Sequence, residues 1–428
     1  MKKRTFETAL LFAAGWCHWS YAATLTVGSG QSGCPTATYP TINTALTAAS
    51  PGDEIDICPG LYAEQLVITK PVTLRGIAAN GMQRVLVQPT TLTNVENQQP
   101  AGGVVPSPAN VPAFQAVISV LNTSDVVIEG LAIDASSNTV TGCTVTLAGI
   151  HFSNASGTVA NNAISGAQLS YPLSCTTLFP GNGFGIQVDT TKGQTGPFSV
   201  SITGNSIHDF NRDGILVNGS GITAAVSGNT ITGVGPSTGY HQFGVFIALG
   251  AVGQVARNII SQGNCGTIDI NDCFNLRSEG VVLRAVGDGT VVDSNMISNV
   301  QSGIFINGGN QAQIINNVIK SVDALDGIDI QGTASGFFTN SVIAGNVIAH
   351  VFPINATTSS NETGCGINEA SGTGVAQNVI VDNTISDAFC AVAFVTADKV
   401  FGGVYSNTLY TTLNTDQFPN SFPPAVEP

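Results

Sequence analysis

The sequence predicts an all-β solenoid, because two short patterns repeat along its middle with the period of a strand. One pattern is Gly, apolar, any, apolar, and it begins at Gly185, Gly214, Gly244, Gly280, Gly303 and Gly327. Successive glycines are 29, 30, 36, 23 and 24 residues apart, a spacing typical of stacked repeats. The other pattern is Asn-x-Ile, at Asn205, Asn229, Asn258, Asn295, Asn317, Asn346 and Asn383. Apolar residues that alternate with period 2 indicate strands rather than helices.

Each Gly segment is too short to fold alone. It must pair with the same segment of the next repeat and bury its apolar side chains in a shared interior. Two such side chains per strand, at about 1.5–3 kcal/mol each, accumulate over many rungs. The recurring Asn suits a tight corner because it tolerates the left-handed conformation, and stacked amides can hydrogen-bond along the axis. We therefore predict that these asparagines are structural.

Two stretches carry a family resemblance, Asn205-Ser206-Ile207 to Asp213-Gly214-Ile215 and Asn317-Val318-Ile319 to Asp326-Gly327-Ile328. They resemble the right-handed parallel β-helix proteins of the pectate-lyase-like superfamily. Residues 39–76 are similar to that family's cap and first coil. The resemblance implies one domain, a single-stranded right-handed parallel β-helix over about residues 23–411. It implies little about activity, because that superfamily includes lyases, hydrolases, esterases, epimerases, binding modules and adhesins.

Residues 1–22 have the features of a secretory signal peptide. Met1-Lys2-Lys3-Arg4 is a basic start, residues 9–16 form a short apolar core, and Ser20-Tyr21-Ala22 supplies small residues for cleavage after Ala22. We therefore expect a mature chain that begins at Ala23 and is secreted or periplasmic. No later segment has roughly 18 uninterrupted apolar residues, so no membrane span is expected.

Eight cysteines remain after this cleavage, and an even number in an exported chain favours disulfides. Zinc binding is the alternative, but no two of these cysteines lie two to four residues apart. Spacing suggests that neighbours pair, although many connectivities are possible. The predicted pairs are Cys34 with Cys58, Cys143 with Cys175, Cys265 with Cys273, and Cys365 with Cys390.

Charge is scarce and acidic: 9% of residues are charged and the formal net charge is −14. Removal of Lys2, Lys3, Arg4 and Glu7 with the signal peptide leaves 10 basic and 26 acidic residues, a net charge of −16. A nucleic-acid partner is not expected, since such binding requires basic clusters. The acidity also argues against a strongly anionic polysaccharide unless calcium or a local arginine patch mediates. We expect no cofactor, with calcium as an open possibility.

A short amphipathic helix is predicted at about residues 41–49, at the N-terminal end of the solenoid. Ile42, Ala45, Leu46 and Ala49 lie on one of its faces, and Pro51-Gly52 ends it. The end coil of a solenoid exposes an apolar cross-section, so we expect this helix to cap it. Strands are predicted to follow at residues 54–57, 66–68, 72–74 and 85–87.

Five prolines between residues 89 and 113 predict an irregular excursion. It is not a domain boundary, because coil patterns resume at Ala116. Residues 412–428 are proline-rich towards their end and are expected to form a loose tail. The further predicted strands are at residues 117–120 and 126–128, and in the last coils at 392–395 and 404–408.

Loop lengths give the best clue to the position of a site. Some coils use 8 to 10 residues between the Asn corner and the next Gly segment, but four use many more. Loops on a rigid scaffold often carry binding and catalysis, although these could be tolerated insertions. We expect the four to emerge from one edge of the coil. They run from Asn162 to Gly185, Asn229 to Gly244, Asn258 to Gly280, and Asn346 to Gly366.

The outward positions of the Gly strands form two columns. Two residues after each Gly the column reads His151, Gln187, Leu216, Phe246, Val282, Phe305 and Asp329. Four residues after, it reads Ser153, Asp189, Asn218, Ala248, Arg284, Asn307 and Gln331. With rungs about 4.8 Å apart, such a ladder suits a sugar chain whose rings stack on Phe and whose hydroxyls bind polar groups. The alternative is an ordinary half-polar surface.

The residues that stand just before each Gly form a third column, which includes two candidate catalytic carboxylates, Asp213 and Glu279. They are two rungs apart, hence roughly 9–10 Å, near the upper end of the separation in inverting glycosidases. The alternative is that Asp before Gly-Ile merely fixes a turn. We predict as catalytic residues Asp213, Glu279, Arg284, His208, Asp209 and Arg212, and as binding residues Arg277, Phe246, Phe305, Asp189, Asp326 and Asp329.

Two functional hypotheses follow. The first is an exported carbohydrate-active protein, a polysaccharide lyase or a hydrolase, that acts across the middle coils. In a lyase, an arginine would serve as base or neutralise a uronate while another group takes the proton. The second is a non-catalytic β-helix that binds glycan or acts as a surface adhesin or scaffold. The histidines His151, His208, His241 and His350 are scattered without ligand spacing, so a His-based metal centre is not expected.

Overall fold

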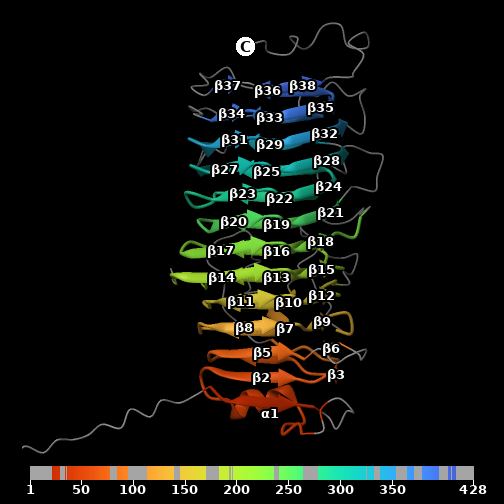
Figure 1. The fold of residues 1–428 in the computed structure, drawn as a ribbon, viewed down its shortest axis with the longest axis vertical. Coiled ribbons are helices and arrows are strands. Elements are labelled where there is room, and N and C mark those ends of the chain that lie inside the picture. Colours follow the sequence, from red (N-terminus) through yellow and green to blue (C-terminus); the bar gives the residue numbers. More distant parts are fainter. Residues whose placement is uncertain are drawn as a thin grey trace, which may run out of the picture.

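The chain winds into a tall stack of coils whose strands form three long parallel sheets (Figure 1). The computed structural model describes residues 22–28, 34, 36–77, 84–94, 113–138, 145–169, 183–191, 194, 196–235, 241–263, 278–323, 325–331, 338–352, 364–370, 378–394, 403–405 and 407–410. Each complete coil runs through sheet A, then sheet B, then sheet C, and returns to sheet A one rung higher. The connections have the right-handed sense that twisted parallel strands favour, so the fold is the predicted right-handed parallel β-helix.

Sheet A has 13 strands and begins the stack. In spatial order its strands are β1 (Thr24–Val27), β2 (Asp53–Ile57), β5 (Val72–Gly76), β8 (Val126–Glu129), β11 (Gly157–Ala160), β14 (Phe198–Thr203), β17 (Ile222–Ser227), β20 (Val252–Ala256), β23 (Val291–Asp293), β27 (Gln313–Ile315), β31 (Val342–Ala344), β34 (Val379–Val381) and β37 (Gly403–Tyr405).

Sheet B has 12 strands and carries the Ile of each Asn-x-Ile pattern. Its strands are β3 (Gly60–Tyr62), β6 (Val85–Val87), β9 (Ala132–Asp134), β12 (Ala163–Ser165), β15 (Ser206–His208), β18 (Thr230–Thr232), β21 (Ile259–Gly263), β24 (Met296–Val300), β28 (Val318–Asp323), β32 (Val347–Phe352), β35 (Thr384–Ala388) and β38 (Thr408–Tyr410).

Sheet C has 11 strands and carries the Gly patterns. Its strands are β4 (Leu66–Ile68), β7 (Ala113–Leu121), β10 (Val145–Ser153), β13 (Gly183–Asp189), β16 (Asp213–Asn218), β19 (Gln242–Ala248), β22 (Ser278–Arg284), β25 (Ser302–Asn307), β29 (Ile328–Gln331), β33 (Cys365–Ala370) and β36 (Cys390–Phe394). A small extra sheet pairs β26 (Gly309–Asn310) with β30 (Phe338–Thr339).

The two sequence patterns meet inside the coil. A Cβ on Gly244 would collide with Cγ2 of Ile260, the Ile of the following Asn-x-Ile, and would lie 2.5 Å from the carbonyl oxygen of Gly280. Each of the six pattern glycines faces an Ile from sheet B and the backbone of the next rung in the same way. The glycines therefore recur because of a close approach, and none of them has a positive φ.

We expect Gly244→Ala to destabilise the protein by about 1–3 kcal/mol, the usual cost of overpacking a filled core. Gly263→Ala is the matched control from the next coil, because its Cβ would meet its nearest neighbour at 3.6 Å, an ordinary contact. Equilibrium unfolding in urea measures both variants. Equal midpoints for the two alanines would contradict the close-packing explanation of the glycine column.

A ladder of buried asparagines runs up the corner between sheets A and B. The side-chain amide of each donates to the Oδ1 of the next at 2.9–3.1 Å, along Asn162, Asn205, Asn229, Asn258, Asn295, Asn317, Asn346, Asn383 and Asn407. The predicted structural role is confirmed, and the ladder is longer by one asparagine at each end.

The ladder asparagines themselves do not adopt the left-handed conformation that was predicted for them at this corner. The left-handed residue is the one before the ladder asparagine, with φ of 53° to 57° where it is not glycine. This offset follows from the hydrogen bonds, because the ladder asparagine must turn its side chain inward to reach the next rung. The left-handed residues are Asn161, Gly204, Gly228, Arg257, Ser294, Asn316, Gly345 and Asp382.

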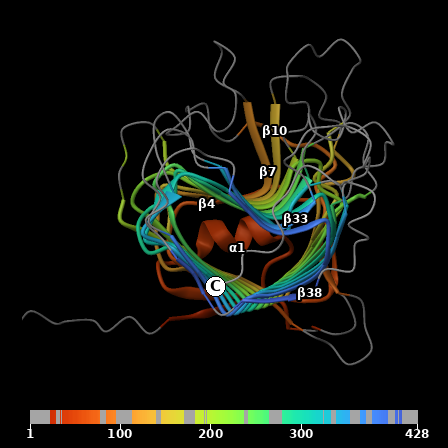
Figure 2. The same cartoon turned by 90° about the horizontal axis from the view of Figure 1, so that it is seen from above.

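Helix α1 (Ile42–Ala48) lies at the N-terminal end of the stack, within the outline of the coils (Figures 1 and 2). Its buried residues Ile42, Ala45 and Leu46 belong to the same core as the coil interior. Glu64 accepts hydrogen bonds from the first two backbone N–H groups of the helix at 2.9 Å. Strand β1 pairs with β2 at the same end, so the helix is one part of this end of the coil rather than a separate lid.

Two of the four predicted disulfides are confirmed. Cys34 pairs with Cys58, and Cys365 pairs with Cys390, with Cα separations of 6.2 and 4.4 Å. The other four cysteines of the predicted pairs, residues 1–21 of the predicted signal peptide and the predicted tail from residue 412 lie outside the described residues. Most of the predicted excursion, residues 95–112, lies outside them as well.

Candidate functional site

The outer face of sheet C is built from three positions on each Gly strand. The residues two and four after the glycine, and the residue just before it, point away from the coil interior, while the apolar residues between them join the main core. Parallel pairing aligns these positions from rung to rung. Phe184, Asp213, Phe243, Glu279 and Ser302 lie side by side in one such column.

This outer face is buried in the middle coils, which differs from the expected exposed ladder. Every residue of β13, β16 and β19 is buried, and so is every residue of β22 except Arg284. Strand β17 on sheet A instead alternates buried and exposed residues, as a half-solvated strand should. Polar side chains on the outer face of sheet C are therefore removed from water and must be satisfied by other groups or serve a function.

Apolar side chains explain part of this burial. Phe184, Leu216, Phe243, Phe246 and Val282 form a second hydrophobic cluster on the outer face, and Phe305 packs against it half-buried. The rings of Phe243 and Phe246 meet edge to face, with centroids 5.4 Å apart. Phe246 is 2% exposed, so its ring packs within the protein, whereas Phe305 keeps partial exposure at the edge of the cluster.

Asp213 lies in this apolar column with both oxygens buried. It pairs in register with Phe184 on one side and Phe243 on the other. Neither carboxylate oxygen accepts a hydrogen bond from any described residue, and Nε of Arg212 lies 4.0 Å from Oδ1. Burial raises the pKa of Asp213 from its usual 3.8 to about 7, and the nearby Arg212 opposes this only in part. The carboxyl can therefore hold or release a proton near neutral pH.

Glu279 is two rungs from Asp213 in the same column, as predicted, with Phe243 between them. It is 2% exposed and lines a small cavity of about 10 Å³, the size of one water molecule. Arg284 lies at the opposite end of the same strand, exposed and aligned with Ala248 and Asn307. The structure thus brings Asp213 and Glu279 into one column and places Arg284 outside it.

The remaining predicted catalytic residues lie elsewhere or outside the described part. His208 and Asp209 are exposed, at and just after strand β15 of sheet B, and His208 Nδ1 is 2.7 Å from Asp209 Oδ2. Asp209 lines a polar groove of about 380 Å³ with Asp134 and Gln168. Arg277 lies outside the described residues. Of the members of the predicted cluster that the structure describes, only Arg212 lies next to Asp213.

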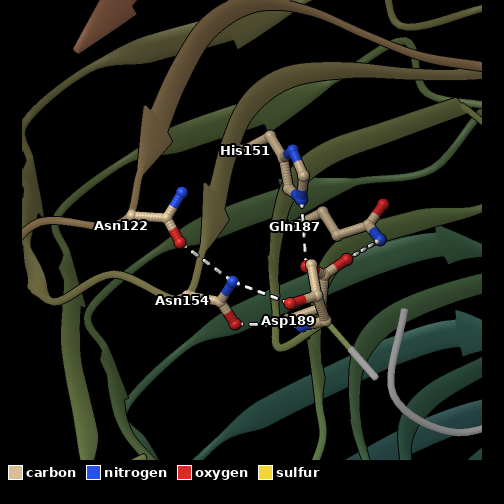
Figure 3. Close-up of polar contacts among 6 residues, drawn as sticks. Asn122, His151, Asn154, Gln187 and Asp189 are labelled. Atoms are coloured by element: carbon tan, nitrogen blue, oxygen red, sulfur yellow. Dashed lines mark hydrogen bonds and ion pairs between the residues drawn. The ribbon is translucent and has the colours of Figure 1, made fainter. Parts of the chain in front are cut away.

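A second polar group lies at the N-terminal end of the outer face, around Asp189 (Figure 3). His151 Nε2 is 3.1 Å from Asp189 Oδ1, and Gln187 Nε2 donates to Asp189 Oδ2 at 2.8 Å. The ring of His151 stacks on Phe114, with centroids 4.1 Å apart. The sequence had marked Asp189 but not His151 or Gln187 as site residues, although both stand two residues after a Gly, where outward side chains meet.

A third polar group lies near the C-terminal end of the face. Asp326 accepts hydrogen bonds from the backbone N–H of Cys365 at 2.7 Å and from Asn368 Nδ2 at 3.0 Å. Gln331 Nε2 donates to Asp329 Oδ2 at 3.0 Å. Burial raises the pKa of Asp326 well above its usual value, the negative charge of Asp329 adds to this, and the two hydrogen bonds oppose it. These two predicted binding residues therefore form a buried acidic pair.

The four long connections do start from one edge of the coil. Each leaves a strand of sheet B and ends at a strand of sheet C, from β12 to β13, β18 to β19, β21 to β22, and β32 to β33. Within the described ranges, no three His, Cys, Asp or Glu side chains are grouped so that they could hold a metal ion. No helix in the same ranges has the length and apolar character needed to span a membrane.

Comparison with known proteins places the chain by fold alone. No family model matches the sequence, and no curated protein is similar to it. Among solved structures, the GH136 lacto-N-biosidase of Eubacterium ramulus is similar with a TM-score of 0.53 and 11% identity, over 91% of this chain and 68% of that one. The A-module of the Azotobacter vinelandii mannuronan C-5 epimerase AlgE4 is similar with a TM-score of 0.43 and 14% identity, over 86% and 93%. The fold is thus that of right-handed parallel β-helix proteins.

Proposed function

We propose that this is an exported carbohydrate-interacting protein that hydrolyses a glycan on the outer face of sheet C. One observation carries the proposal: Asp213 is a buried carboxyl without a hydrogen-bond partner among the described residues, with a pKa of about 7, two rungs from Glu279. A buried polar group left unsatisfied is costly, and such groups cluster at functional sites. The two disulfides support export, since they persist in oxidising compartments.

The two carboxyl groups fit the roles of an inverting glycosidase. Protonated Asp213 would donate its proton to the glycosidic oxygen as the bond from that oxygen to the anomeric carbon breaks. Glu279 would remove a proton from a water that attacks the opposite face of the anomeric carbon. Two rungs separate the Cα atoms by roughly 9–10 Å, which leaves room for that water. Phe305 would offer the partly exposed ring against which a sugar stacks.

Hydrolysis is favoured over elimination by the charges on this face. Within the described residues, its outer positions carry Asp189, Asp213, Glu279, Asp326 and Asp329. A lyase must neutralise the carboxylate of a uronate, and these five acids supply no positive charge for that. Arg284 is exposed at the far end of its strand, so it does not offset the buried acids.

The test is release of reducing ends from a panel of plant, algal and bacterial polysaccharides by the purified protein. We expect hydrolysis of an uncharged polymer, and a loss of about 100-fold or more in kcat in Asp213→Asn and in Glu279→Gln, since each removes one proton-transfer group. Glu129→Gln on sheet A is the matched control and should leave the rate unchanged. An unsaturated, ultraviolet-absorbing product would instead indicate a lyase, and full activity in both site variants would place the site elsewhere.

A non-catalytic role is the second candidate, and the burial of the outer face favours it. No residue of β13, β16 or β19 is exposed, so these strands present no open groove for a polymer. In that case the coil would serve as a glycan-binding adhesin or scaffold through another surface. Binding of a polysaccharide in affinity electrophoresis without any product would select this role over hydrolysis.

A further inference from the structure

We propose that the outer face of sheet C carries a second ligand site at its N-terminal end, for an uncharged, hydroxyl-rich ring such as a neutral sugar residue. We call it the His151 site and define it by Ser119, His151, Gln187, Asp189 and Asn218. It is separate from the Asp213 column and does not depend on whether Asp213 takes part in hydrolysis.

The register of four adjacent strands assembles the site. Ser119 on β7, His151 on β10 and Gln187 on β13 are direct neighbours in the column two residues after the glycine. Asp189 on β13 and Asn218 on β16 are direct neighbours in the column four residues after it. Adjacent strands lie about 4.8 Å apart, so the five side chains cover an area about three rungs long, the size of one or two sugar rings.

The hydrogen-bonding capacity of this site is largely unused. Ser119, Gln187 and Asn218 are each 0% exposed. No described residue forms a hydrogen bond with Ser119 Oγ, with Gln187 Oε1, or with either polar atom of the Asn218 side chain. In Figure 3 the amide oxygen of Gln187 points away from Asp189. A buried polar atom without a partner costs about 1–3 kcal/mol, which a ligand that supplies partners would recover.

The neighbouring polar network shows what a purely structural arrangement looks like here. Asn154 Nδ2 donates to Asn122 Oδ1 at 3.1 Å and to Thr191 Oγ1 at 2.9 Å, and its Oδ1 accepts from the backbone N–H of Thr191 at 2.9 Å (Figure 3). This side chain thus uses both its amide nitrogen and its oxygen. Asn154 thus links the turns that follow β7, β10 and β13. Asn218, at the end of the next strand β16, has no such partners among the described residues.

The chemistry of the five side chains selects the class of ligand. Amide and hydroxyl groups both donate and accept, which matches the hydroxyls of a sugar. None of the five is Lys or Arg, and both oxygens of Asp189 are already engaged by His151 and Gln187. An anionic ring would meet the Asp189 carboxylate without a fixed cation opposite it, so the site should reject uronates. The stacked pair of Phe114 and His151 provides a flat apolar wall.

The experiment is saturation-transfer difference NMR and calorimetric titration of the intact mature protein. The probes are the neutral sugars glucose, galactose, xylose and N-acetylglucosamine. Glucuronate and galacturonate are the negatively charged counterparts of glucose and galactose and serve as comparison ligands. We expect saturable binding of at least one neutral sugar, weaker by about tenfold or more in Asn218→Leu and in Gln187→Met, because each loses hydrogen bonds worth about that factor. Ser119→Ala is the milder variant if the other two fold poorly.

Binding should persist in Asp213→Asn, which separates this site from the proposed hydrolysis. If Asp213→Asn abolished binding, the sugar would occupy the Asp213 column and the His151 site would be rejected. The proposal is also overturned if no neutral sugar binds the folded protein, if the folded His151-site variants bind as tightly as the wild type, or if the uronates bind as well as their neutral matches.

Discussion

Replacement of Asn258 by Ala should destabilise the protein by about 4 kcal/mol, because two buried backbone groups lose their side-chain partner at once. Asn258 Nδ2 donates to the carbonyl of Val226 at 3.0 Å, and its Oδ1 accepts from the backbone N–H of Asn229 at 3.0 Å. Each orphaned group costs about 1–3 kcal/mol, in addition to the two broken amide bonds of the ladder. Urea unfolding followed by far-ultraviolet circular dichroism measures the loss.

Two further variants test this explanation. Asn43→Ala removes a single hydrogen bond from an exposed position on α1 and should cost no more than about 1 kcal/mol. Asn258→Asp keeps the shape and the acceptor but places an oxygen where Nδ2 meets Val226 and Asn295, so it should be as harmful as Ala at neutral pH. Should Asn258→Ala cost no more than Asn43→Ala, the ladder would be incidental to stability.

The coil was predictable from the sequence because its two patterns arise from one contact, between the pattern glycine and the Ile of Asn-x-Ile. Gly244 has no Cβ where Ile260 packs, and Asn258 stands two residues before that Ile, so the glycine and asparagine columns have to recur together. Spacing alone also gave the pairs Cys34–Cys58 and Cys365–Cys390. In a stack of coils, residues near in sequence lie one rung apart, so local spacing contains much of the tertiary structure.

The candidate site was less predictable, for a reason visible in Phe246 and Asp213. The alternation of apolar residues with period 2 shows which side chains point outward. It does not show whether other parts of the protein cover that outward face. Phe246 was expected to offer its ring to a sugar, and it packs against Phe243 at 2% exposure. His208 and Asp209 are close to Asp213 in sequence, but the chain turns from sheet B to sheet C between them, so they face another side.

The partners of Asp189 were missed for a related reason. The outward columns place His151 beside Gln187 and Ser153 beside Asp189, but they do not show that His151 Nε2 reaches across to Asp189 Oδ1 in the other column. The register places Gln187 beside His151, and Asp189 two residues further along that strand. The glycine spacing already fixes the rungs, but it does not show which side chains of the two columns hydrogen-bond to each other.

Stability should fall as pH rises from about 4 to about 7, and Asp213 should be a main cause. Its pKa in the folded protein, about 7, lies above its usual 3.8, so between these values the folded state holds a proton that the unfolded state has released. Each unit of pKa difference is worth about 1.4 kcal/mol, so ionising Asp213 in the folded state costs about 4 kcal/mol. Thermal or urea unfolding at a series of pH values measures the slope.

Asp213→Asn isolates this contribution, because the amide has the same shape and does not ionise. Near pH 4 the variant and the wild type should be about equally stable, and at pH 8 the variant should be more stable by about 4 kcal/mol. Burial also raises the pKa values of Asp326 and Glu369, so a smaller fall should remain in the variant. A variant less stable than the wild type at pH 8 would show that ionised Asp213 is satisfied in solution. The same substitution that removes the proposed proton donor should thus strengthen the fold, which is expected of a carboxyl kept at a cost for its chemistry.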